Sequence, residues 1–117
     1  MQYLCLIYEE ESQMLSRSEE EQEQIMADYW AFTGEVRENG QLVAGEALMP
    51  TETATTVRIR NGERVTTDGP FAETKEQLGG FYLLECKDLD EAIEQASKIP
   101  SSKFGSIEVR PIMVFDQ

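Results

Sequence analysis

Histidine is absent from this chain of 117 residues, cysteine occurs twice and tryptophan once. Without histidine the chain cannot build a Ser-His-Asp triad, and the usual zinc and haem sites are excluded. We therefore expect no metal and no cofactor, and any chemistry must use carboxylate, lysine, tyrosine or water. Cys5 and Cys86 both lie within apolar runs typical of strands, which favours small buried side chains over a disulfide framework or a metal site.

Basic residues and long apolar runs are also scarce. The 10 lysines and arginines face 23 acids, which makes the formal charge -13, and such a field repels phosphate backbones and anionic membranes. We therefore expect no direct nucleic-acid ligand. No run approaches the ~20 apolar residues of a membrane span, and the amino terminus lacks a basic start followed by an apolar core. The sequence predicts a cytoplasmic protein with no membrane partner.

A single domain spanning residues 1–117 is what this length predicts, with a core small enough for a partner subunit to be useful. Residues 3–8 are apolar at both alternating sets of positions, so a strand there needs cover on both faces. The acidic stretch 9–23 predicts surface charge, in a loop and the solvated start of a helix, because acids are favoured at the positive end of a helix.

Capping patterns open two helices, each with an oxygen-bearing side chain followed three residues later by glutamate. The pairs are Ser18 with Glu21 and Asp88 with Glu91. Asn39-Gly40 ends the first helix and Pro100 follows the second. Apolar residues recur at helical spacing in the first helix and predict one core face. Trp30 is interpreted as packing beside that face rather than as a ligand contact.

Asn61-Gly62 is the strongest hairpin signal in the sequence, because both residues of such a two-residue turn take positive φ. The flanking strands are predicted at residues 54–60 and 63–67. With that turn, the pairing runs on until Thr55 lies opposite Asp68. Alternation then places Asp68 on the face that carries Val57, and we expect its carboxylate to be at least partly desolvated.

Three further strands complete the plan. They are predicted at residues 42–48, from 80 or 81 to 86, and at 107–115. The order along the chain is strand, helix, strand, hairpin, strand, helix, strand. This predicts an α+β protein of the ferredoxin-like βαββαβ plan with an extra β-hairpin, in which an antiparallel sheet carries two helices on one face.

The second face of that sheet also needs cover, because three of the strands are apolar on both sides. A second copy of the same sheet would bury it and give a homodimer with a two-fold interface. The alternative is a monomer in which the hairpin folds back over its own sheet.

Asp68 is the sharpest candidate for chemistry. A carboxylate beside apolar side chains has its charged form disfavoured, which suits it to general acid or base catalysis. The alternative is a turn role, because in Asp-Gly-Pro the aspartate accepts backbone N–H bonds and the glycine takes a positive φ. Glu73 and Lys75 follow in a loop that ends at Gly79-Gly80. Loops of this kind on a rigid sheet commonly carry binding groups, although exposed charges of little energetic value are the usual outcome.

Three further residues are candidates for ligand binding. Arg58 and Arg110 are bases within otherwise apolar strands, and each is either an ion-pair partner within the fold or an anchor for an anionic ligand. Tyr8 ends a central strand, where its hydroxyl either faces a cavity or bonds to the backbone.

Residues 66–81 combine turn-forming residues, acids, a lysine and two glycines, and include the tetrapeptide Asp68-Gly69-Pro70-Phe71. In this stretch the chain resembles the small bacterial YCII-related proteins of the DGPF type. The likeness extends over residues 3–8, 45–48, 54–58 and 106–111. It implies a dimeric α/β barrel. Some branches of the wider superfamily carry a His-Asp pair proposed as catalytic, and this chain cannot supply the histidine.

The sequence and the resemblance together predict a protein that binds a small organic molecule in a pocket near the loop from Asp68 to Lys75. Asp68 would serve as a general acid or base without a cofactor, as the resemblance to cofactor-free monooxygenases and lyases of this superfold implies. The alternative is a non-enzymatic binding or sensing protein, or an accessory to transcription, because relatives of the DGPF type are often encoded next to sigma factors.

Overall fold

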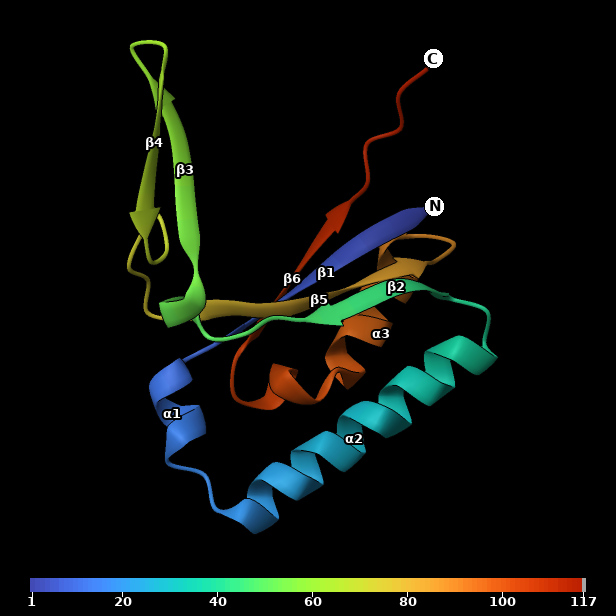
Figure 1. Cartoon of the computed structure of the whole chain (residues 1–117). Helices are drawn as coiled ribbons and strands as arrows, with labels where there is room; N and C mark the ends of the chain where they lie inside the picture. Colours follow the sequence, from blue (N-terminus) through green and yellow to red (C-terminus); the bar gives the residue numbers. More distant parts are fainter. Residues whose placement is uncertain (117) are drawn as a thin grey trace.

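The fold is an antiparallel four-stranded sheet with helices on one face and a separate two-stranded hairpin (Figure 1). The structure is a computed structural model that describes residues 1–116. The strands are β1 (Gln2–Glu9), β2 (Leu42–Ala47), β3 (Thr55–Arg60), β4 (Glu63–Asp68), β5 (Gln77–Glu85) and β6 (Ser106–Pro111). The α-helices are α1 (Glu11–Leu15), α2 (Glu19–Glu38) and α3 (Leu89–Lys98), and η1 (Thr51–Thr53) and η2 (Pro100–Lys103) are 3-10 turns. The sheet order β2-β5-β1-β6 confirms the ferredoxin-like plan.

Both predicted capping pairs form. The Ser18 hydroxyl accepts the backbone N–H of Glu21 at 3.1 Å, and the Asp88 carboxylate accepts that of Glu91 at 2.9 Å. Gly40 has a φ of 74° just after α2, as its role in ending that helix predicts. Among residues 1–116, no helix is both long enough and apolar enough to cross a membrane.

The hairpin has the predicted turn and register. Asn61 and Gly62 have φ of 53° and 77°, as a type I′ turn requires, and Thr55 pairs with Asp68. The hairpin forms a two-stranded sheet of its own and rises on the side of the main sheet opposite the helices (Figure 1). It therefore does not fold back over its own sheet.

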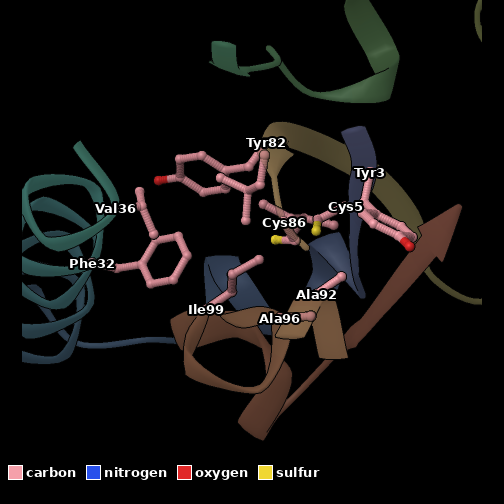
Figure 2. Close-up of a cluster of buried hydrophobic side chains, with 11 residues drawn as sticks. Tyr3, Cys5, Phe32, Val36, Tyr82, Cys86, Ala92, Ala96 and Ile99 are labelled. Atoms are coloured by element: carbon pink, nitrogen blue, oxygen red, sulfur yellow. The ribbon is translucent and has the colours of Figure 1, made fainter. Parts of the chain in front are cut away.

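The core lies between the sheet and the helices. Alternate residues of β1, namely Tyr3, Cys5 and Ile7, are buried. Figure 2 shows Phe32 and Val36 of α2 on the same side of the cluster as Tyr82 of β5, and the Phe32 and Tyr82 rings meet edge to face with centroids 5.1 Å apart. The intervening β1 residues face the other side of the sheet.

Several boundaries differ from the sequence predictions. The acidic stretch contains the short helix α1 rather than only a loop and a helix start. β5 begins at Gln77 and includes Gly79-Gly80, because a Cβ on Gly80 would lie 2.7 Å from the Glu46 carbonyl oxygen and only glycine allows that approach. β6 ends at Pro111, short of the predicted residue 115, and one further backbone bond joins the Ile112 N–H to the Gln2 carbonyl at 2.9 Å.

Trp30 also differs from its prediction. Its side chain is 68% exposed on the outer face of α2, so the interpretation as a packing residue was wrong. The core stripe of α2 passes through Phe32 and Val36, and Trp30 lies on the opposite side of the helix.

The buried thiol of Cys5 should make the fold sensitive to alkali. Burial, and next the nearby Cys86, raise the pKa of Cys5 from 9.0 to about 11. Because the unfolded chain loses this proton first, the stabilisation is complete below pH 9 and falls as the pH rises toward 11. We expect a loss of roughly 2–3 kcal/mol in the free energy of unfolding.

Urea unfolding of the wild type and of Cys5→Ala across this pH window would measure the loss. The variant is expected to show a flatter dependence of stability on pH. Equal slopes for the two proteins would contradict the assignment.

Candidate functional site

The side of the sheet opposite the helices has an uncovered apolar strip. Leu4 and Leu6 of β1 pair with Leu83 and Phe81 of β5, and all four are only partly buried. We call this side the open face. Because apolar side chains with a few polar neighbours are typical of ligand and subunit contacts, this strip is a candidate for such a contact.

Polar side chains gather on the open face where β1 ends and β6 begins. The hydroxyl of the half-buried Tyr8 donates to Oε1 of Glu108 at 3.4 Å, a long hydrogen bond. Next to it, the Ser106 hydroxyl donates to Oε1 of Glu76 at 2.8 Å. A hydroxyl and a carboxylate in contact can hold and exchange a proton with a bound molecule.

Hydrogen bonds fix the base of the hairpin against this end of the sheet. The Glu11 carboxylate accepts the backbone N–H and the hydroxyl of Thr51 at 2.8 and 2.7 Å. The Glu11 N–H donates to Oε1 of Gln77 at 2.9 Å, and the Gln77 amide donates to the Thr74 carbonyl at 2.6 Å. The start of α1, the turn before β3, the start of β5 and the predicted binding loop are therefore joined.

Asp68 lies at the base of the hairpin, at the end of β4, and is exposed. The predicted desolvation of its carboxylate is therefore wrong for a single chain. The turn is closed by other groups, because the Gly69 N–H donates to the Ala54 carbonyl at 2.7 Å and the Thr56 hydroxyl donates to the Gly69 carbonyl at 2.9 Å. Within residues 1–116 the Asp68 carboxylate forms no hydrogen bond or ion pair, so this turn does not use it.

The other predicted residues occupy separate places. Arg58 is half-buried on the opposite face of the hairpin from Asp68, and Arg110 lies on the open face opposite Leu4. Leu4 and Tyr8 are about 13 Å apart along β1. Glu73 and Lys75 are exposed in the loop before β5.

Among residues 1–116, neither Arg58 nor Arg110 forms an ion pair with Asp68 or Glu108. The predicted partnering within the fold is therefore not seen. The structure thus brings Tyr8 and Arg110 to one face. It leaves the hairpin and loop residues at its border.

The sequence analysis did not identify Glu11, Thr51 and Gln77, whose hydrogen bonds hold the base of the hairpin against the sheet. Glu11 stands in an acidic run that was interpreted as surface charge, and nothing in the run distinguishes it from its neighbours. Glu9 in the same run pairs with Arg17 at 3.5 Å, and both side chains are only 13% exposed.

A hollow lies elsewhere, on the helix side. It measures about 500 Å³ and is bordered by α1, α2 and Phe104. Arg17 stands in its wall with the guanidinium carbon 4.2 Å from the centre of the Phe104 ring, and this arginine already pairs with Glu9. Among residues 1–116, no group of three acidic or cysteine side chains is placed to hold a metal ion.

Comparison with known proteins gives relatives over nearly the whole chain. An uncharacterised protein of Rhizobium meliloti strain 1021 is 44% identical over an aligned length of 117, and the match covers 98% of this chain and 94% of that protein. The solved structure of 5-chloro-2-hydroxyhydroquinone dehydrochlorinase (TftG) from Burkholderia phenoliruptrix AC1100, in complex with 2,5-dihydroxybenzoquinone, shares the fold with a TM-score of 0.54. That match has 15% identity and covers 97% of this chain and 94% of the other. A family model matches residues 1–116, and the chain belongs to the YCII-related domain family.

Proposed function

We propose that this protein is a homodimer that binds a small organic molecule on the open face, beside Tyr8 and the base of the hairpin. The observation that carries the proposal is the uncovered strip of Leu4, Leu6, Phe81 and Leu83, which adjoins the Tyr8–Glu108 pair. Small-molecule sites are mostly apolar, with a few polar groups that fix orientation. A second copy on this face would enclose it, as a two-fold contact between identical surfaces does.

The residues of the proposed site differ in the contact that each can make with the ligand. Phe81 and the leucines offer a flat apolar surface, and Arg110 and Arg58 are unpaired bases within residues 1–116 that suit an anionic oxygen. Tyr8 would donate to the ligand, and Asp68, with the loop that carries Glu73 and Lys75, would close over it. Asp68 is our candidate general acid or base, because its carboxylate is not used by its own turn.

TftG guides the choice of probe, since that protein of the same fold is an enzyme solved with 2,5-dihydroxybenzoquinone. We would titrate this compound and a panel of hydroxylated aromatics into the protein by calorimetry and follow any turnover. Tyr8→Phe and Asp68→Asn are each expected to lower affinity or rate by about tenfold or more, because a hydrogen bond involving a charged group is lost. Glu94→Gln on the exposed side of α3 is the matched control.

The variants also separate catalysis from binding. A slower reaction at unchanged affinity in Asp68→Asn would assign catalysis to Asp68, whereas affinity without turnover in the wild type would favour a binding or sensing protein. Binding and turnover by both variants at the wild-type level, with the fold intact, would refute the site.

One observation favours the second candidate function, a binding or sensing protein with a protein partner such as a transcription factor. Met26 and Trp30 are exposed one turn apart on α2, away from the open face. Exposed aromatic residues of this kind are common in protein contacts.

A further inference from the structure

The hairpin β3–β4 stands outside the body of the chain. It rises from one end of the main sheet, and β4 has no buried residue (Figure 1). Val57 and Ile59 are 59% and 61% exposed on the same face of β3. A lone two-stranded hairpin is marginally stable in water, so an apolar stripe on such a hairpin needs a surface to cover it.

The whole chain is less compact than its length predicts. Its Cα radius of gyration is 16.4 Å, whereas a compact domain of this length has about 13 Å. Residues 112–116 rise on the same side of the sheet as the hairpin (Figure 1), and the apolar side chains there are exposed, namely Met113, Val114 and Phe115. The open face therefore has an apolar strip of its own, and exposed apolar side chains of the hairpin and of residues 112–116 project beside it.

The hairpin also differs from the rest of the chain in charge. It carries three of the ten basic residues, Arg58, Arg60 and Arg64, against the two acids Glu63 and Asp68, in a chain whose formal charge is -13. None of the three arginines forms an ion pair within residues 1–116. A basic hairpin on an acidic protein is complementary to the body of a second copy.

The length of the hairpin decides where it would lie in a dimer. Its strands have six residues each and extend about 20 Å. Two sheets packed face to face are separated by about 10 Å. A hairpin that rises from the rim of one open face therefore continues beyond the plane of the second sheet, alongside the other subunit.

We propose that the hairpin is an intersubunit arm whose tip, residues 60–64, packs against the acidic body of the second copy, outside the contact between the two open faces. This inference rests on the homodimer of the proposed function. The arm supplies a second, electrostatic contact to the dimer, while its base keeps Asp68 at the site of its own chain.

The test compares the dimer dissociation constants of two charge-reversal variants by analytical ultracentrifugation. Arg60→Glu with Arg64→Glu changes the arm. Arg37→Glu with Lys87→Glu makes the same change of net charge at exposed positions outside it. We expect the arm variant to weaken the dimer by roughly tenfold or more and to reduce its dependence on salt, and we expect the control to change the constant by less than about threefold.

Three results would contradict the proposal of an intersubunit arm. An unchanged dissociation constant in the arm variant would remove it from the interface and leave the proposed homodimer intact. If both variants weakened the dimer equally, the effect would be explained by general electrostatic repulsion between the two subunits. A wild-type protein that is monomeric at about 100 µM would refute the homodimer and the arm together. Circular dichroism of each variant would confirm that the fold is retained, since all four altered residues are exposed.

Discussion

Replacing Gly105 with alanine should lower the free energy of unfolding by about 3 kcal/mol or more. A Cβ atom at this position would overlap the carbonyl oxygen of Tyr8 and lie 3.1 Å from Cγ of Glu9. Backbone cannot yield as the end of a flexible side chain does. Gly105 immediately precedes β6, whose first residue pairs with Tyr8, so the change would push β6 away from β1 at the candidate site.

Gly34→Ala is the matched control for this substitution. Gly34 lies within α2 and a Cβ there meets nothing within 4 Å, so alanine should stabilise the helix by up to about 1 kcal/mol. Urea unfolding followed by circular dichroism, at one protein concentration, would compare the two. A Gly105→Ala protein as stable as the wild type would show that β1 and β6 are not held as closely as described.

Leu84→Ala should cost about 2–5 kcal/mol, because it opens a cavity in the core. Leu84 is fully buried against the helices. Its neighbour Leu83 has the same chemistry on the opposite face of β5, where it pairs with Leu4 on the open face. The two leucines therefore make a matched pair that compares a face covered within the chain with one that is not.

Leu83→Ala distinguishes a covered open face from a free one. If a second copy buries this face, the cost should approach that of Leu84→Ala and should grow as the protein is diluted, since unfolding is then linked to dissociation. If the face is free, we expect about 1 kcal/mol at every concentration. Urea unfolding at two protein concentrations measures the difference, and a small cost independent of concentration would contradict the homodimer.

Local signals were sufficient for much of the fold. Ser18, Asp88 and Gly40 act within one turn of their own helices, and Asn61-Gly62 sets the hairpin register by itself. That register determines which side of the hairpin Asp68 occupies. Alternation along β1 divides its residues between two faces. Such features depend on a few neighbouring residues, so a single sequence can predict them.

The candidate site could not be predicted in the same way, because it is formed by contacts between segments that are distant in the sequence. Glu11 bonds to Thr51, 40 residues away, and Tyr8 bonds to Glu108, 100 residues away. No local pattern distinguishes Glu11 from the other acids of its run. Trp30 was misplaced for a similar reason, since the row of α2 that meets the sheet is chosen by how the whole helix packs.

By itself, the sequence determined the order of the elements, their caps and turns, and the two apolar faces of β1. These follow from backbone preferences and from side-chain periodicity, which act over short distances along the chain. Only the tertiary structure decided that the hairpin stands clear of the sheet, that one chain leaves its open face uncovered, and that Asp68 is left free at the rim of that face. The physical reason is that burial and hydrogen-bond partners depend on which segments, distant in the sequence, pack together. Local sequence patterns do not specify that packing.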